Sequence, residues 1–360
     1  MKYNIISDAV SPLRVLCRKI CIGVLAVGFT IVGTSCDDDD NNTFDYGSLT
    51  PPAAVYSPEV TQTMQNLWAT SSALDDKDSR TAAYAAIQAW ADDCPADEIY
   101  MRYRDADTPL ALAIPNIYPA LQCYDMAFDR VLNALKAGMP ADGKPRVWAL
   151  YNMGIVVQTA SGNYAVDIYH RRGAELAPYI DFYAITHVHA DHKWEPLARA
   201  MSEAGKPVLT NFAIPGVNNS AYLSTEEKDY TLGSFKIHSF ITHHNSSPLT
   251  TLAITAFFVE GGGVSILHSG DSNFIAEEFE SMRGRRVDFY VFRYAVNALT
   301  ENNVLGNVVT PKVAVLSHIL ELGHKDVANS RWSLQLGLER AARLNSDNVV
   351  MPFWGDALTL

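Results

Sequence analysis

Positive charge is scarce in this sequence. The 360 residues include 28 Lys and Arg against 40 Asp and Glu, which gives a net charge of −12 at pH 7. Proteins that bind nucleic acid need clustered basic residues to neutralise phosphates, and only a short patch over residues 283–286 approaches that pattern. We therefore expect no nucleic acid partner and predict a small-molecule substrate instead.

Long hydrophobic runs are also missing, since the apolar stretch over residues 20–32 is too short to span a bilayer comfortably. Basic residues precede this stretch, and small residues lead from it into Cys36, an order typical of a secretory signal. The junction resembles the bacterial lipobox, which implies that residues 1–35 are cut off and that Cys36 carries a diacylglycerol. The alternatives are an ordinary signal peptide with an incidental Cys36, or an uncleaved anchor.

An acidic and proline-rich stretch over residues 36–57 follows the signal. Such a polar segment cannot pack and is expected to act as a tether that holds the body of the protein away from a membrane. An acidic run after the lipidated cysteine resembles the surface-display signal of Bacteroidetes lipoproteins. We therefore expect an exported outer-membrane lipoprotein, either periplasmic or surface-exposed, whose membrane contact is the lipid at Cys36.

Cysteine is rare as well, with five in the chain. Only Cys94 and Cys123 lie beyond the signal and the proposed lipidation site. In an oxidising compartment these two can form a disulfide, and the alternative is a pair of buried thiols. The sequence does not show whether their Cα atoms come within bonding range, so both interpretations stay open.

The rest of the chain divides into two parts. Residues 58–143 form a histidine-free helical segment, with helices expected over residues 58–70, 79–92 and 118–137. Residues 144–360 contain short β-branched and aromatic runs separated by turn signals and helical stretches, which favours sheets covered by helices. The expected strands are 155–159, 164–169, 182–185, 208–209, 235–240, 252–259, 264–267, 289–292, 313–316 and 349–351. The expected helices are 196–204, 276–282 and 330–344.

Two common hydrolase motifs are absent. The sequence contains neither His-Glu-x-x-His nor Gly-x-Ser-x-Gly, which argues against a helix-borne zinc protease and a serine hydrolase. All ten histidines lie between residues 170 and 324, and His187, His189, Asp191 and His192 fall within six positions. His187 and His189 follow a predicted strand and point to the same face, where they can share one cation. Asp191 and His192 lie where the chain turns toward a helix, so they can address a second cation.

The stretch from His187 to His192 resembles the His-x-His-x-Asp-His signature of the metallo-β-lactamase superfamily. This resemblance covers residues 144–360 and implies an α/β fold, the four-layer αββα sandwich, here with an added N-terminal helical segment. It also implies two divalent transition-metal ions, with zinc preferred and iron or manganese as alternatives. The His268-Ser269-Gly270-Asp271-Ser272 stretch resembles the lactonase-like branch.

The order of ligands in that family can be followed along this chain. It implies His244 as the third histidine with His243 as its competitor, Asp271 as the bridging carboxylate, and His318 as the last histidine with His324 as its competitor. Three further residues are expected to support the ligands without binding metal: Asp167, which would accept hydrogen bonds from the ligand loop, Glu321 and His268. His170 and His238 are expected to be structural.

The resulting hypothesis is a hydrolase that uses hydroxide held by two metal ions to cleave an ester, lactone, amide or phosphodiester. Asp191 would then also be catalytic, orienting the hydroxide and carrying a proton to the leaving group. The alternatives are a non-catalytic metal-containing binding lipoprotein on the cell surface and a di-iron redox protein of the same fold.

Overall fold

The computed structural model describes residues 56–74, 78–94, 100–105, 113–244, 252–294, 304–323 and 333–360. All of them belong to one compact unit that spans Leu49–Leu360. The predicted signal peptide, the lipidation site at Cys36, nearly all of the tether, and His324 lie outside the described residues. None of the described helices combines the length and the apolar character that a membrane-spanning helix needs.

The N-terminal part is helical, as the sequence predicts. Helix α2 (Pro58–Trp68) begins where the Ser57 hydroxyl accepts a hydrogen bond from the Val60 N–H. Helix α3 (Asp78–Asp92) and the short helix α4 (Met101–Arg104) follow, and α6 (Pro119–Ala137) ends at Gly138, whose φ of 79° suits a glycine. A 3₁₀ turn, η3 (Ile114–Asn116), precedes α6.

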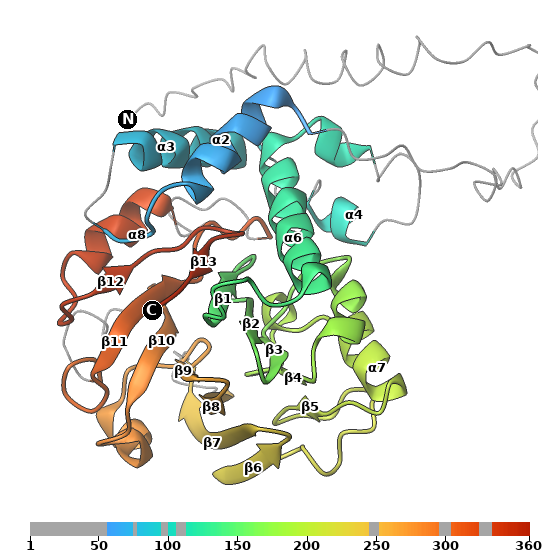
Figure 1. The fold of residues 1–360 in the computed structure, drawn as a ribbon, viewed down its shortest axis with the longest axis vertical. Helices are drawn as coiled ribbons and strands as arrows, with labels where there is room; N and C mark the ends of the chain where they lie inside the picture. Colours follow the sequence, from blue (N-terminus) through green and yellow to red (C-terminus); the bar gives the residue numbers. More distant parts are fainter. Residues whose placement is uncertain are drawn as a thin grey trace, which may run out of the picture. The chain divides into compact units, whose positions relative to one another are not determined.

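Two sheets follow the helices (Figure 1). The first has the order β13-β1-β2-β3-β4-β5, and the second has the order β12-β11-β10-β9-β8-β7-β6. The first sheet contains β1 (Arg146–Ala149), β2 (Ile155–Thr159), β3 (Gly162–Val166), β4 (Phe182–Ala184), β5 (Val208–Leu209) and β13 (Ala357–Leu358). The second contains β6 (Lys228–Leu232), β7 (Phe235–His243), β8 (Ala253–Gly261), β9 (Val264–His268), β10 (Val287–Arg293), β11 (Pro311–Ser317) and β12 (Val349–Val350).

The alternation of side chains along the strands creates two separate apolar clusters. On β2, Ile155 and Val157 join the cluster between the sheets, together with Phe289 and Val291 of β10. The intervening Val156 faces the opposite side and joins the cluster that contains the helices. Because successive strand residues point to opposite faces, each sheet buries one face against the other sheet and one face under helices.

Helices cover both outer faces, so the predicted α/β sandwich of helix, sheet, sheet and helix is confirmed. Helices α6 and α7 (Glu195–Glu203) lie beside the first sheet, while α8 (Leu334–Ala341) lies beside the second (Figure 1). The 3₁₀ helix η6 (Ala276–Met282) also covers the second sheet, where Phe279 packs on Tyr290. Two further 3₁₀ segments, η4 (Gly173–Tyr179) and η5 (Ala190–His192), precede α7.

Some predicted boundaries are wrong for local reasons. The strand expected over residues 164–169 ends at Val166, because Asp167 has a φ of 50° and leaves the extended conformation. The helix expected over 276–282 is a 3₁₀ helix. The strand β6 was not predicted, because its mostly exposed residues give no apolar alternation at this sheet edge.

The helical segment is joined to the sandwich by specific polar contacts. Arg80 of α3 is buried and pairs with Asp356 at 2.5 Å, next to β13. The Trp68 indole N–H of α2 donates to the carbonyl of Trp354 at 2.9 Å. A buried ion pair of this kind constrains geometry strongly because removing one partner leaves an uncompensated charge. The helices therefore have a fixed position on the sandwich.

Candidate metal centre

The ligand loop is held by one buried carboxylate. Asp167 directly follows β3, and its Oδ1 accepts the Thr186 N–H at 2.8 Å. Its Oδ2 accepts the Thr186 hydroxyl at 2.7 Å and contacts His192 Nδ1 at 2.8 Å. A carboxylate at Nδ1 fixes the proton there and leaves Nε2 of the same ring for another partner. Asp167 therefore lies where the sequence predicts a support of the ligand loop, and it belongs to neither group of candidate ligands.

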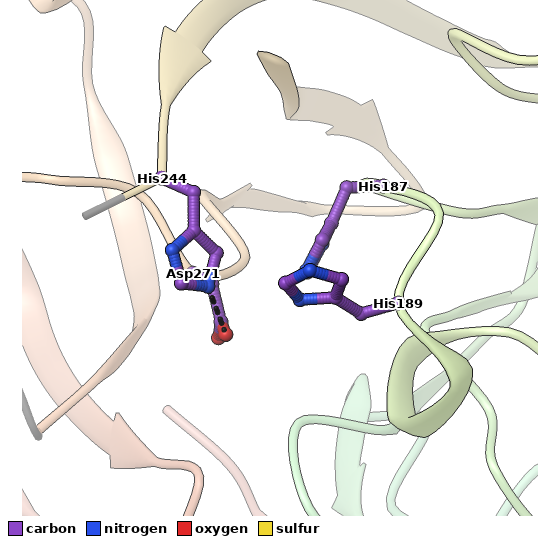
Figure 2. Close-up of side chains that lie close together, drawn as sticks. All are labelled: His187, His189, His244 and Asp271. Atoms are coloured by element: carbon purple, nitrogen blue, oxygen red, sulfur yellow. Dashed lines mark hydrogen bonds and ion pairs between the residues drawn. The ribbon is translucent and has the colours of Figure 1, made fainter. Parts of the chain in front are cut away.

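The first group of candidate ligands contains His187, His189, His244 and Asp271, whose ligand atoms all lie within 4.8 Å of one another (Figure 2). His187 and His189 lie in the loop after β4. His244 follows β7, and Asp271 lies in the turn after β9. His187 and Asp271 are buried, while His189 is exposed. The group can therefore bind a cation and remain accessible from one side.

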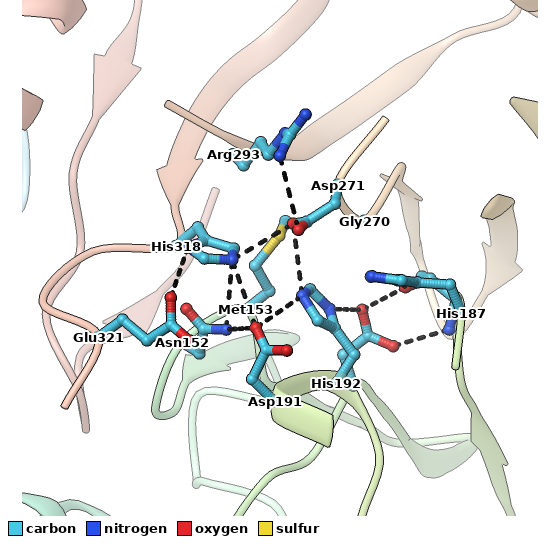
Figure 3. A network of polar contacts seen from close by, with 12 residues as sticks. Asn152, Met153, His187, Asp191, His192, Gly270, Asp271, Arg293, His318 and Glu321 are labelled. Carbon is cyan, nitrogen blue, oxygen red and sulfur yellow. Dashed lines mark hydrogen bonds and ion pairs between the residues drawn. The ribbon is translucent and has the colours of Figure 1, made fainter. Parts of the chain in front are cut away.

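The second group contains Asp191, His192 and His318, which also lie within 4.8 Å of one another. Asp271 contacts both groups, His244 on one side (Figure 2) and His192 and His318 on the other (Figure 3). Its Oδ1 lies 3.3 Å from His192 Nε2 and 3.4 Å from His318 Nε2, while its Oδ2 lies 3.1 Å from His244 Nε2. One carboxylate therefore offers one oxygen to each group, the arrangement that a bridging ligand of two cations requires.

Among the described residues, three buried ligand atoms in these groups have no hydrogen bond: His187 Nε2, His192 Nε2 and Asp271 Oδ1, of which the last two lie 3.3 Å apart. Buried polar atoms are nearly always satisfied, so three orphaned atoms that converge on one place need an explanation. Imidazole nitrogen and carboxylate oxygen are the donors that zinc and iron accept in proteins. The residues present therefore fit divalent metal ions.

The pKa values of the ligands show how the charges balance in the metal-free protein. Burial lowers the pKa of His187 well below its usual value, and the neighbouring His192 adds to this effect. Burial also lowers the pKa of His318, but Asp271 and Asp191 outweigh it and raise the value to about 10. His318 therefore carries a proton near neutral pH, which metal binding has to displace.

A glycine permits the close approach of the second sheet to the ligand loop. Gly270 directly precedes Asp271 and has a φ of 51°, which only glycine adopts easily. A Cβ atom at this position would lie 2.5 Å from the Thr186 hydroxyl. The Gly-Asp pair therefore brings Asp271 against the same threonine that Asp167 holds.

The structure separates the competing histidines. His244 belongs to the first group, whereas His243 lies outside both groups, with its Nδ1 2.5 Å from Glu278 Oε1. The geometry therefore favours His244 over His243 as the third histidine ligand. His318 belongs to the second group, with Glu321 at 3.8 Å from its Nδ1, and its competitor His324 falls outside the described residues.

The remaining histidines have structural surroundings. His268 is buried, with Nε2 2.9 Å from the Met153 carbonyl and Nδ1 accepting the Gly270 N–H at 3.2 Å, so it supports the Gly-Asp turn. His170 stacks on Phe128 with ring centroids 4.0 Å apart. His238 Nδ1 lies 2.8 Å from Asp229.

Two residues near the centre were missed by sequence reasoning. Asn152, in the turn between β1 and β2, donates from Nδ2 to Asp191 Oδ2 at 2.7 Å and has a φ of 59°. Arg293, the last residue of β10, has a buried guanidinium whose Nη1 lies 3.6 Å from Asp271 Oδ2. A single asparagine or arginine carries no spacing signal. Only the tolerance of asparagine for left-handed backbone hints at Asn152.

The helical segment contacts the loop that follows His318. Tyr100 packs near Gly323, where a Cβ atom would lie 3.4 Å from the tyrosine ring. Its ring also contacts Tyr151 at 5.5 Å between centroids, and the Tyr151 hydroxyl accepts the Leu322 N–H at 2.7 Å. The helices therefore help to position the chain that follows His318.

The two cysteines beyond the proposed lipidation site are buried thiols, and no disulfide joins Cys94 to Cys123. Burial raises the pKa of the Cys123 thiol far above its usual value. Of the two interpretations that the sequence left open, the pair of buried thiols holds, and the disulfide does not form.

No family model and no curated protein matches this chain. Several solved structures do match this chain. The metallo-β-lactamase fold protein YhfI from Bacillus subtilis is 15% identical over 60% of this chain and 99% of its own, with a TM-score of 0.42. The metallo hydrolase Igni18 from Ignicoccus hospitalis is 15% identical over 60% and 98%, with a TM-score of 0.43. CmlA, a diiron β-hydroxylase from Streptomyces venezuelae, is 11% identical over 66% and 63%, with a TM-score of 0.43.

Proposed function

We propose that this protein is a metal-dependent hydrolase of a small ester, lactone, amide or phosphodiester, with two zinc ions as the preferred cofactor. The observation that carries the proposal is Asp271, whose two carboxylate oxygens are divided between two groups of candidate ligands. The orphaned ring nitrogens of His187 and His192 support the same conclusion. Iron or manganese would fit the same donors.

His187, His189, His244 and Asp271 would hold one ion, while Asp191, His192 and His318 with Asp271 would hold the other. When bound, two such cations supply charge that makes water acidic near neutral pH and polarises the oxygen under attack. Asp167 keeps His192 in the required tautomer through its contact with Nδ1.

Asp191 is the residue of this site best suited to move a proton. Its Oδ2 accepts the Asn152 amide N–H at 2.7 Å, which fixes the carboxylate and leaves Oδ1 available. Burial raises the pKa of Asp191, but the neighbouring His192 and His318 outweigh it and hold the pKa well below the usual range. The group is therefore a carboxylate that can accept a proton from the attacking water and deliver it to the leaving group.

We further propose that the substrate belongs to the lactone or cyclic ester class, which the His-Ser-Gly-Asp-Ser stretch of residues 268–272 supports by its resemblance to the lactonase-like branch. The cellular location is proposed as the outer membrane, with a lipid on Cys36 as the anchor, supported by the lipobox-like junction. Radiolabelled palmitate incorporation that is lost in Cys36→Ala would test the anchor.

Adjacent histidines provide a matched test of the hydrolase proposal. His244→Gln changes a candidate ligand, whereas His243→Gln changes the neighbour that contacts Glu278. We expect purified protein to hydrolyse members of a panel of esters, lactones and phosphodiesters, to lose this activity with chelator, and to lose it in His244→Gln but not in His243→Gln. Asp191→Asn should lose turnover while it keeps its fold.

Metal analysis of the same preparations separates the alternatives. Two zinc ions per chain with no turnover on any substrate would favour a non-catalytic metal-containing binding protein. A content dominated by iron would favour di-iron redox chemistry. Activity that survives complete removal of metal would contradict the proposal.

A further inference from the structure

Arg293 is a buried cation without an adequate counter-charge. It ends β10, and its side chain is 8% exposed. The Nη1 atom lies 3.6 Å from Asp271 Oδ2, which exceeds hydrogen-bond range (Figure 3). Within the part of the chain that the structure describes, the buried Nε and Nη2 atoms have no hydrogen-bond partner. A guanidinium carries five N–H donors, so most of its bonding capacity is unused.

Asp271 cannot neutralise Arg293 when the proposed metal ions are bound. Its Oδ2 already lies 3.1 Å from His244 Nε2, and its Oδ1 faces His192 and His318. A carboxylate that is shared by two cations has no charge to spare for an arginine. A buried charge that lacks a partner is strongly unfavourable, which makes this site a place where an added anion would be stabilised.

We propose that Arg293 binds an anionic group of the substrate, a carboxylate or a phosphoryl group, immediately beside the metal centre. This inference rests on the proposed hydrolase function and narrows its substrate class to anionic lactones, esters or phosphoesters. The planar guanidinium suits such groups because its donors match two oxygens of a carboxylate or phosphate at once. Arg293 is accordingly a residue for substrate recognition and positioning.

The experiment uses zinc-loaded protein and three benzene derivatives, which distinguish recognition of a carboxylate from recognition of a phosphoryl group. Benzoate carries the carboxylate, phenylphosphonate carries the phosphoryl group, and benzamide is a neutral molecule of the same shape as benzoate. Binding is measured by calorimetry for wild type, Arg293→Met and Arg293→Lys. The matched control is Arg286→Met, which alters an arginine at the other end of β10 whose side chain is 70% exposed.

We expect Arg293→Met to weaken the binding of at least one anion about tenfold to a hundredfold, the loss expected for charge-assisted hydrogen bonds. Arg293→Lys should be intermediate, and Arg286→Met should equal wild type. Loss confined to benzoate assigns a carboxylate, and loss confined to phenylphosphonate assigns a phosphoryl group. Equal anion affinity in wild type and Arg293→Met, or an equal loss for benzamide, would overturn the proposal.

The melting temperature distinguishes an arginine that binds substrate from one whose role is only structural. In buffer without added anion, Arg293→Met should melt at the same temperature as wild type or higher, because an uncompensated buried charge has been removed. Marked destabilisation of this variant would overturn the proposal. Because binding is measured without turnover, anion recognition by Arg293 in a protein that hydrolyses nothing would leave this inference intact while the hydrolase proposal fails.

Discussion

Asn152 holds the catalytic candidate Asp191 in place, and removal of its amide is expected to weaken both stability and metal binding. The side chain is 1% exposed, donates to Asp191 Oδ2 at 2.7 Å and lies 3.4 Å from His318 Nε2. Its φ of 59° is in the left-handed region. Two variants separate these features: Asn152→Gly deletes the amide and keeps the backbone relaxed, while Asn152→Ala deletes the amide and keeps a Cβ atom.

The magnitudes follow from the contacts. A hydrogen bond to a charged group contributes about 1.5–3 kcal/mol, so both variants should lose on the order of this free energy of unfolding in the metal-free protein. A Cβ atom in left-handed backbone costs about 1–2 kcal/mol, so Asn152→Ala should be less stable than Asn152→Gly. Loss of a residue that orients a ligand typically lowers metal affinity about 10–100-fold, and both variants should show this loss.

The assays are urea unfolding of chelated protein and zinc affinity by competition with a chromophoric chelator. Asn219→Ala is the control, because Asn219 is also buried but donates to the Thr210 hydroxyl at 2.8 Å, away from the ligands. This control should lose stability and keep wild-type metal affinity. Wild-type affinity in Asn152→Gly would refute the reasoning, as would greater stability of the alanine variant than of the glycine variant.

Asp167→Asn should lower metal affinity about 10–100-fold, because the amide cannot accept every hydrogen bond that the carboxylate receives, and unchanged affinity by chelator competition would contradict this role. The pKa of His318 is raised to about 10 in the metal-free fold from a usual value of 6.5, since Asp271 and Asp191 outweigh burial. The stability that His318 contributes should therefore be complete below pH 6.5 and be lost as the pH rises through 10, and a flat profile of chelated protein by urea unfolding would exclude it. Cys94 and Cys123 should resist thiol reagents in the native protein, and a melting temperature that falls with reductant would indicate a disulfide instead.

Local periodicity explains how much of the site the sequence could predict. His187 and His189 are two residues apart after a strand, and the structure brings them into one group while Asp191 and His192 join the other. The strand-ending position of Asp271 could be predicted for the same reason, because an apolar run identifies β9 directly before it.

What the sequence could not predict depends on contacts between distant parts of the chain. Asn152 meets His318 across 166 residues, and no spacing rule connects them. The choice between His243 and His244 was open because the sequence does not show that Glu278 from η6 contacts His243, while His244 lies among the candidate ligands. Arg293 ends a strand whose burial on both faces conceals a charged residue among apolar ones.

The most direct test of the account is anomalous diffraction from crystals of zinc-loaded protein at the zinc absorption edge. Two peaks are expected, one among His187, His189 and His244 and the other among Asp191, His192 and His318, with Asp271 contacting both. A single peak with Asp271 on one side only would contradict the bridging role, and no peak at either group would contradict the metal centre itself.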